Sequence, residues 1–200
     1  AIFVFIVGVR VYYVTNPMTG GILKLDSGPL AVLAIVLVIG WIVLVMNALN
    51  WLDGVDGLSG GVALISSATM FILSLRPEVN QPPIAILCAI FAGVILAFLI
   101  FNFNPSRVLA GTSGAKFMGF ILAILAIFSG TKIATAMLVM VIPIIDSFWV
   151  IMERIKKKKS IFRADKSHLH HKLLELGWSQ KEIALSYYWI TFVIAVIALN

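Results

Sequence analysis

The sequence predicts an all-α, polytopic membrane protein with about seven transmembrane helices. Hydrophobic residues make up 61% of the 200 residues and charged residues only 12%, and the mean hydropathy is +1.06. The surface of a soluble protein would need about 25 to 35% charged residues, so the excess of apolar side chains must face lipid. The apolar residues also fall into runs close to the roughly 17 to 25 residues that a helix needs to cross a bilayer.

Seven apolar runs, separated by polar or turn-rich connections, are expected to form these helices. They cover residues 1–14, 30–46, 58–75, 83–100, 114–128, 132–152 and 183–199. The first run is short for a full span, and the turn-rich residues 16–28 follow it. The chain does not begin with Met, and apolar sequence reaches both of its ends. We therefore expect one integral membrane domain over residues 1–200, belonging to a longer protein that continues at the N-terminus and the C-terminus.

The distribution of basic residues predicts the orientation of these helices. Of the fifteen Lys and Arg residues, eleven lie in one alternating set of connections, and basic residues are retained on the cytoplasmic side. Residues 47–57, 102–116 and 152–183 are therefore expected to be cytoplasmic loops. The run from Lys156 to Lys159 fits an anchor against anionic lipid headgroups, so the net charge of +6 does not indicate nucleic acid binding. The single cysteine, Cys88, excludes an internal disulfide.

The first polar cluster contains Asn47, Asn50, Asp53 and Asp56, spaced three residues apart. Neighbours at this spacing are adjacent on a helix, and the whole set converges only if the helix ends nearby. Four glycines between residues 54 and 61 provide that opportunity and allow backbone to approach a ligand closely. A capped helix end explains one Asn and one Asp. It does not explain four polar groups at membrane depth, so a functional site is preferred.

The second cluster follows the expected helix over 83–100. It consists of Asn102, Asn104, Pro105, Arg107, the segment Gly111-Thr112-Ser113-Gly114 and Lys116. Hydroxyls and free backbone N–H groups at the N-terminus of the next helix favour an anion such as phosphate. The alternative is an ordinary N-cap by Thr112 or Ser113, and the spacing leaves both interpretations open.

The third cluster holds Arg163, Lys166, His168, His170 and His171, which include all three histidines of the chain. Histidines in a basic loop bind anionic phosphate or, when neutral, a metal ion. A zinc site would need a fourth ligand that the sequence does not identify. A short amphipathic helix closed by a glycine is expected directly after this cluster.

One carboxylate, Asp146, falls inside an expected span. An ionisable residue at membrane depth indicates function by default. Pro143 lies three residues earlier and frees a backbone carbonyl, so a buried hydrogen bond at a helix kink is the alternative. Of the two interpretations, the buried hydrogen bond at a helix kink is preferred.

Taken in order, the three clusters resemble the motifs of the polyprenyl-phosphate N-acetylhexosamine-1-phosphate transferases of the glycosyltransferase 4 type. The residues that carry the resemblance are Asn47-x-x-Asn50-x-x-Asp53-Gly-x-Asp56-Gly, then Asn102-x-Asn104-Pro105 with Gly111-x-x-Gly114, then Asp165-Lys166-x-His168-Leu169-His170-His171. The resemblance covers nearly the whole chain. The last motif is similar to the undecaprenyl-phosphate N-acetylglucosamine-1-phosphate transferase branch and less similar to the peptidoglycan translocase branch.

This resemblance implies a complete protein of about ten or eleven helices in the bacterial cytoplasmic membrane. It implies transfer of N-acetylhexosamine 1-phosphate from a UDP-sugar to undecaprenyl phosphate, with release of UMP and assistance from Mg²⁺. Such transfer starts the synthesis of cell-envelope polysaccharides, including lipopolysaccharide and teichoic acid linkages. A homodimer is compatible with this expectation.

The resemblance also implies roles for individual residues. The expected catalytic residues are Asp53, Asp56 and His168, and Asp53 is the expected metal ligand. The expected substrate-binding residues are Asn47, Asn50, Asn102, Asn104, Arg107, Arg163, Lys166, His170 and His171.

The sequence departs from the family pattern at two places. The adjacent aspartate pair that the family carries upstream is absent from this chain, and Thr112 occupies the position where the family has an aspartate metal ligand. A hydroxyl is a poorer Mg²⁺ ligand than a carboxylate. A catalytically weak or inactive relative that binds nucleotide sugar is therefore an alternative. A membrane transporter is a further alternative, based on Asp146 and the glycine-interrupted segment 54–61.

Overall fold

The computed structural model describes residues 13–15, 22–24, 28–129, 140–156 and 168–200. These residues are helical apart from one small hairpin. The helices are α2 (Gly28–Leu52), α3 (Leu58–Ser74), α4 (Pro82–Asn102), α5 (Gly111–Phe128), α7 (Val141–Lys156), α8 (Leu169–Glu175) and α9 (Gln180–Ala198). The predicted helical membrane fold is confirmed.

The chain divides into two compact units, Ala1–Leu44 and Val45–Asn200, with the boundary inside α2. The first unit contains the hairpin, in which β1 (Tyr13–Thr15) pairs antiparallel with β2 (Ile22–Lys24). These strands are not among the elements expected from the sequence. They lie where the first apolar run ends and the turn-rich segment follows, and they are the one exception to the all-α class among the described residues.

Four helices are long and apolar enough to cross a membrane: Leu30–Leu52 of α2, Pro82–Asn102, Gly111–Phe128 and Gln180–Ala198. Helix α3 is a shorter apolar helix and lies where a span over 58–75 is predicted. The predicted run 1–14 lies outside the described residues except for its last two, and most of the first half of the run 132–152 does so as well. The chain is therefore a multi-pass membrane protein, and the predicted number of seven spans stays a prediction.

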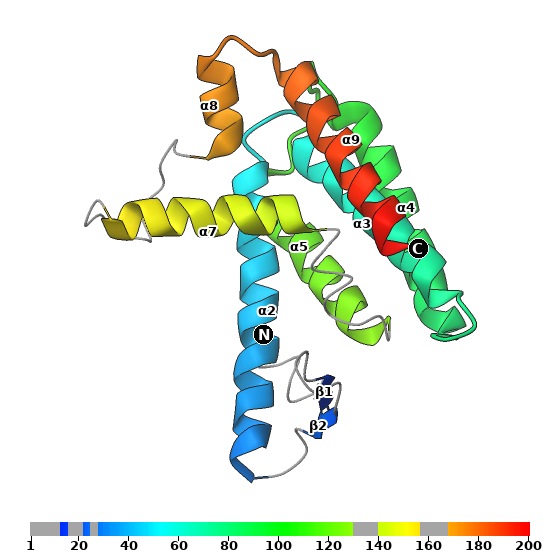
Figure 1. Ribbon diagram of the computed structural model, residues 1–200. Coiled ribbons are helices and arrows are strands. Elements are labelled where there is room, and N and C mark those ends of the chain that lie inside the picture. The colour runs from blue at the N-terminus through cyan, green and yellow to red at the C-terminus, as the bar shows by residue number, and fades with distance from the viewer. Residues whose placement is uncertain (1–12, 16–21, 25–27, 130–139, 157–167) are drawn as a thin grey trace. The chain divides into compact units, whose positions relative to one another are not determined.

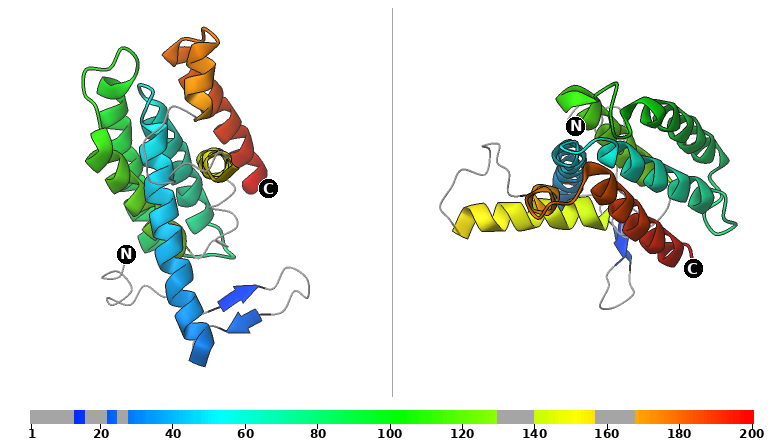
Figure 2. Two further views of the ribbon diagram at one scale, coloured as in Figure 1. Left: turned by 90° about the vertical axis from the view of Figure 1, so that its left-hand side faces the viewer. Right: turned by 90° about the horizontal axis from the view of Figure 1, so that it is seen from above.

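Three helices of the second unit pack side by side, with α3 between α4 and α9 (Figures 1 and 2). Small residues on α3 permit close approach. A Cβ added at Gly61 would overlap the ring of Tyr188 on α9, and the Ser67 hydroxyl donates to the backbone oxygen of Cys88 on α4 at 2.8 Å. On the other flank, a Cβ at Gly119 of α5 would lie 2.7 Å from the Cα of Met46. These contacts set how closely the helices approach one another.

Helix α7 differs from the helix expected over 132–152. Its described part has 16 residues and ends in charged residues, and it is not among the helices long and apolar enough to span a membrane. In the left view of Figure 2, α7 is seen end-on while α3, α4 and α9 run along the picture plane, so it lies crosswise to them. One face is buried and includes Asp146, while Phe148, Trp149 and Met152 are exposed. Residues 132–139 of the predicted span lie outside the described residues, so this span stays a prediction. Within 141–152 the buried face includes the two polar residues Asp146 and Ser147.

We predict that Gly61→Ala destabilises the packing of α3 against α9. The added methyl group has no space beside Tyr188, and overpacking of this kind costs about 1 to 3 kcal/mol. The measurement is thermal unfolding in detergent. The matched control is Gly93→Ala on α4, where nothing lies within 4 Å of the added Cβ and where the melting temperature should not fall. Equal melting temperatures for the two variants would contradict this packing.

Candidate active site

The carboxylate of Asp56 joins two connections at one end of the helices. Oδ2 accepts hydrogen bonds from the Asn104 side chain and from the Ser106 backbone N–H, both at 3.1 Å. Oδ1 accepts the Ser106 hydroxyl at 2.8 Å. The backbone N–H of Asp56 donates to the side-chain oxygen of Gln180, at the start of α9, at 2.9 Å. The turn after α2, the connection after α4 and the first turn of α9 are thereby held together.

Asn102, at the end of α4, makes a second link between the first two clusters. Its side-chain oxygen accepts the Gly57 N–H at 3.1 Å, and its amide donates to the Val108 oxygen at 2.8 Å. The Tyr188 hydroxyl donates to the carbonyl of Gly57. Gly57 has φ +78°, a conformation that favours glycine. Both ends of the Asn102 side chain are therefore used within the protein.

Asp53 faces the N-terminus of α5. Its carboxylate accepts the Ser59 hydroxyl at 2.6 Å and is hydrogen-bonded to the backbone of Gly111. Burial raises the pKa of Asp53 above its ordinary value, and these two hydrogen bonds oppose that shift. An anion does lie at this helix N-terminus, and it is a carboxylate of the protein itself.

Helix α5 begins differently from the expected N-cap by Thr112 or Ser113. The N-cap position is Ala110, no side chain caps the helix, and Gly111 has φ +62°. Thr112 and Ser113 lie inside the first turn and are exposed. The alternative interpretation as an ordinary hydroxyl cap is therefore wrong. Thr112, at the position where the resemblance leads us to expect a carboxylate, follows directly on Gly111, whose backbone contacts Asp53.

The histidines of the third cluster form a row beside Trp51, in the last turn of α2. The ring centroids of Trp51 and His168 are 5.5 Å apart. His168 and His170 stack nearly parallel at 5.6 Å, and His170 and His171 follow at 4.3 Å. A Cβ at Gly54 would lie 2.7 Å from Nε2 of His170. The three histidines of the third cluster therefore lie directly against the end of the first cluster.

His170 is fully buried, and neither of its ring nitrogens hydrogen-bonds to a described residue. Burial lowers the pKa of His170 to about 4, with a further contribution from His171. The ring is therefore neutral near pH 7 and offers one N–H donor and one acceptor. Leaving such groups unsatisfied costs about 1 to 3 kcal/mol, so a buried ring of this kind is suited to a polar ligand.

Asp146 makes a buried hydrogen bond, as preferred from the sequence, but its partners lie in the third cluster. Oδ2 is 2.8 Å from Nδ1 of His168, and Oδ1 accepts the N–H of Leu169 at 2.8 Å. The backbone oxygen of Pro143 instead accepts the hydroxyl of Ser147 at 2.6 Å. The carboxylate thus serves the histidine segment and not the helix kink.

The remaining predicted residues are placed less centrally. Asn47 and Asn50 are half-buried on the last turns of α2, which extends through the expected loop as far as Leu52. Arg107 is exposed. Arg163 and Lys166 lie outside the described residues.

Several residues of the site carry no signal of their own in the sequence. Ser59, Ser106 and Gln180 hold the two aspartates through hydrogen bonds, and Trp51 flanks His168. The start of α9 does have a signal that the sequence analysis missed. Ser179 and Glu182 form a capping box, a pairing that the spacing of Ser and Glu predicts. The expected glycine-terminated helix is α8, where Gly177 has φ +90°.

The donor set fits a Mg²⁺ ion only in part. Within the described residues, no group of three or more His, Cys, Asp or Glu side chains could hold a metal ion. Asp56 is engaged in three hydrogen bonds, which leaves the half-buried Asp53 as the available carboxylate. Mg²⁺ is commonly held by one or two carboxylates together with substrate phosphates. The site fits a metal shared with a phosphate ligand and does not fit a cage made by protein alone.

Comparison with known proteins gives one consistent family. Residues 1–130 match the family described as glycosyl transferase family 4. A Bacillus subtilis protein named probable undecaprenyl-phosphate N-acetylglucosaminyl 1-phosphate transferase is 32% identical over 165 residues, covering 80% of this chain and 46% of that protein. The decaprenyl-phosphate N-acetylglucosaminephosphotransferase of Mycobacterium leprae is 33% identical over 184 residues, covering 80% of this chain and 46% of that protein.

A third relative comes from the other branch considered above. The phospho-N-acetylmuramoyl-pentapeptide-transferase of Bacillus cytotoxicus is 31% identical over 156 residues, covering 76% of this chain and 47% of that protein. The chain therefore spans about half the length of the curated relatives that it matches.

We predict that Gly54→Ala displaces His170 from its buried position. The new methyl group would meet Nε2 of His170 at 2.7 Å, closer than van der Waals contact allows, and the ring is the group free to move. The measurement is the rate at which diethyl pyrocarbonate modifies His170, followed by mass spectrometry of the peptide. The rate should rise in Gly54→Ala and stay at the native value in Gly93→Ala. An unchanged rate in both variants would show that Gly54 does not seat the histidine.

Proposed function

The chain belongs to glycosyl transferase family 4, and from this premise we propose that it transfers an N-acetylhexosamine 1-phosphate unit from a UDP-sugar to a polyprenyl phosphate. The product is a lipid-linked diphosphate sugar, and UMP leaves. The names of the relatives support this reaction, since each contains a phosphotransferase activity and two name a polyprenyl phosphate. UDP-N-acetylglucosamine and undecaprenyl phosphate are the proposed substrates, in the synthesis of cell-envelope polysaccharide.

One observation carries the proposal: the buried, neutral His170 lies over the segment that holds Asp53, where the apolar helices end. A lipid phosphate must keep its chain in the bilayer while its headgroup reaches the reaction. A site at the ends of α2, α4 and α9, all candidate membrane spans, meets that requirement. A transporter would instead place its polar groups near the membrane midplane.

The proposed chemistry is a displacement at phosphorus. An oxygen of the polyprenyl phosphate attacks the sugar-bearing phosphorus of the UDP-sugar and forms a new P–O–P bond. The P–O bond to the uridine-linked phosphate breaks, and its electron pair leaves with UMP. No proton transfer is needed, because both the attacking and the leaving oxygen belong to ionised phosphates. The protein's task is to position two anions and to stabilise the charge at the transferred group.

The residues of this chain divide that task. His170 offers its N–H to a phosphate oxygen, and His168 and His171 extend the row on either side. Arg107 is exposed beside the site and contributes positive charge. Asp53, together with substrate phosphates, would hold Mg²⁺, which reduces repulsion between the two anions when bound. Asp56 and Asn102 keep the connections in place.

We further propose that the site faces the cytoplasm of a bacterial cell and that the membrane is the cytoplasmic membrane. The eleven basic residues assigned to this side support the orientation. UDP-sugars are made in the cytoplasm, so the orientation also gives the enzyme access to its donor.

We predict that Asp53→Asn lowers transfer by roughly 100-fold or more, because an amide cannot bind a cation as a carboxylate does. The amide oxygen can still accept the Ser59 hydroxyl, so the fold should persist. The measurement is transfer of radiolabelled sugar phosphate from UDP-N-acetylglucosamine to undecaprenyl phosphate in membranes. The control is Glu78→Gln, which removes the same charge from the exposed turn between α3 and α4. Full activity of Asp53→Asn would assign Asp53 a structural role.

We also predict that the native protein needs an unusually high Mg²⁺ concentration and that Thr112→Asp lowers this requirement. The new carboxylate would stand beside Gly111, whose backbone contacts Asp53, and would restore a second anionic ligand. The measurement is a Mg²⁺ titration of transfer at saturating UDP-sugar. Ser113→Asp adds the same charge at the next exposed position of α5 and should have a smaller effect.

Two other outcomes of this titration would change the interpretation. If the native protein binds UDP-sugar but transfers only after Thr112→Asp, it is the non-catalytic relative that Thr112 favours. If the native protein is fully active at ordinary Mg²⁺ and the substitution changes nothing, position 112 has no part in metal binding.

A further inference from the structure

The carboxylate of Asp146 is held between two groups at the start of the histidine segment. Oδ2 lies 2.8 Å from Nδ1 of His168, and Oδ1 accepts the backbone N–H of Leu169 at 2.8 Å. Asp146 and His168 are both buried. The two residues belong to different elements, α7 and the N-cap position of α8. A buried charge of this kind is stable only when its hydrogen bonds and charged partners offset the free-energy cost of removing it from water.

Both partners of Asp146 must donate to it. The backbone N–H of Leu169 can only donate, and an ionised carboxylate can only accept, so Nδ1 of His168 has to carry its proton. In the uncharged form of the ring, a proton on Nδ1 leaves the lone pair on Nε2. An amide in place of the carboxylate could accept the Leu169 N–H with its oxygen, but its donor would then face Nδ1, which is compatible only with a proton on Nε2. The geometry therefore selects one tautomer of His168.

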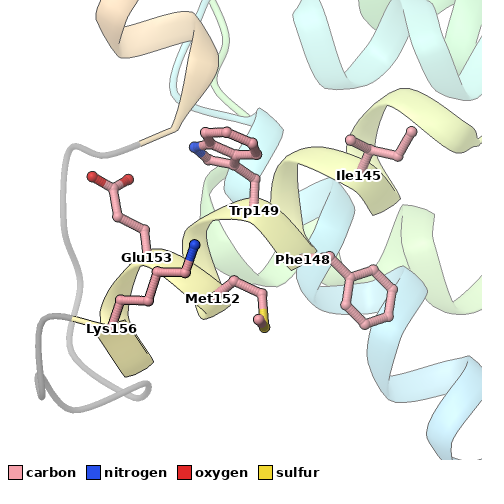
Figure 3. A pocket seen from close by; sticks show the side chains of 6 residues that line it. All are labelled: Ile145, Phe148, Trp149, Met152, Glu153 and Lys156. Atoms are coloured by element: carbon pink, nitrogen blue, oxygen red, sulfur yellow. The ribbon is translucent and has the colours of Figure 1, made fainter.

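A second contact fixes α8 against the same helix. Nζ of Lys172 lies 3.7 Å from the Glu153 carboxylate and 5.9 Å from the centre of the Trp149 ring. Figure 3 shows Trp149 and Glu153 on α7 among the side chains that line a pocket along this helix. Helix α7 thus holds α8 at two places, at its first residue and one turn later. The orientation of the histidine row depends on α7.

We propose that Asp146 is a positioning residue of the transfer reaction, which fixes the tautomer and the position of the His168 ring. The reaction itself rests on the function proposed above. Through the stacking of His168 on His170, the same contact also determines where the unpaired nitrogens of His170 lie. Asp146 does not touch the reacting groups in this arrangement. Its effect is transmitted through imidazole rings.

The first test is a double-mutant cycle measured by sugar-phosphate transfer in membranes. Asp146→Asn places an amide donor opposite Nδ1 and should lower kcat by about 10- to 100-fold, the usual effect of removing a partner that orients a functional histidine. His168→Gln should lower kcat at least as much. The double variant should be no worse than His168→Gln alone, since Asp146 acts only through that ring. Asp146→Glu keeps two acceptors and should recover part of the activity.

The matched control is Ser147→Ala, the next residue on α7. It is equally buried, and it loses only a hydrogen bond within its own helix. Its transfer rate should stay close to that of the native protein. A loss similar to that of Asp146→Asn would mean that any disturbance of α7 lowers activity, and it would overturn the specific role of Asp146.

The second test does not depend on activity. Nitrogen-15 NMR of histidine-labelled protein in detergent distinguishes the two imidazole tautomers, and His168→Gln identifies the signal. The native protein should show protonated Nδ1, and Asp146→Asn should shift the proton to Nε2. If the native protein shows no transfer, the proposed function fails. The nitrogen-15 signal of His168 would still show whether Asp146 sets the tautomer of that ring. An unchanged tautomer in Asp146→Asn, or additive losses in the cycle, would overturn the inference.

Discussion

The hydrogen bonds of the Asp56 carboxylate are the contact on which the arrangement of the site depends. They join residues about fifty positions apart, and the Asp56 backbone adds a bond to Gln180 at a separation of 124 residues. The turn between α2 and α3, the connection between α4 and α5, and the first turn of α9 are thereby held together. A carboxylate suits this place because it accepts several hydrogen bonds at once, and because an unsatisfied polar group next to lipid would be costly. The other polar groups of the site are arranged around this junction.

The two aspartates of the first cluster have different environments despite lying three residues apart. Asp56 is satisfied by side chains and backbone of the connection after α4. Asp53 is half-buried at the N-terminus of α5, and burial raises its pKa. Of the two carboxylates, Asp53 accepts fewer hydrogen bonds from the protein, which suits it to bind a cation that a substrate brings. The motif therefore combines Asp56, which holds the connections of the site together, with Asp53, whose carboxylate is available to a ligand.

The sequence predicted most of the described helices, because runs of apolar residues are set by the bilayer. It also placed the three clusters on one side, and the structure brings the first two clusters and the three histidines of the third together. It did not predict that α7 lies crosswise, since the alternation of Asp146 and Ser147 with large apolar residues is weak within an apolar context. It also could not assign partners. In the sequence, Asn102, Asp56 and Asp53 are all simply polar residues of the motifs. Only the fold shows which groups each side chain contacts. Residues 157–167, with Arg163 and Lys166, lie outside the described part of the chain.

The glycines of the first motif have a different use from the one that the sequence suggested. They were expected to let backbone approach a ligand, but the space beside Gly54 is taken by His170 and the space beside Gly61 by Tyr188. The motif is therefore shaped to receive the C-terminal part of this same chain. The family model matches residues 1–130, and the histidine row lies further along the chain, where His170 and His171 pack against Gly54. A change in the later segment can thus alter how substrates are held without touching a residue of the earlier motifs, because the two halves meet through close contacts at Gly54 and not through a shared stretch of sequence.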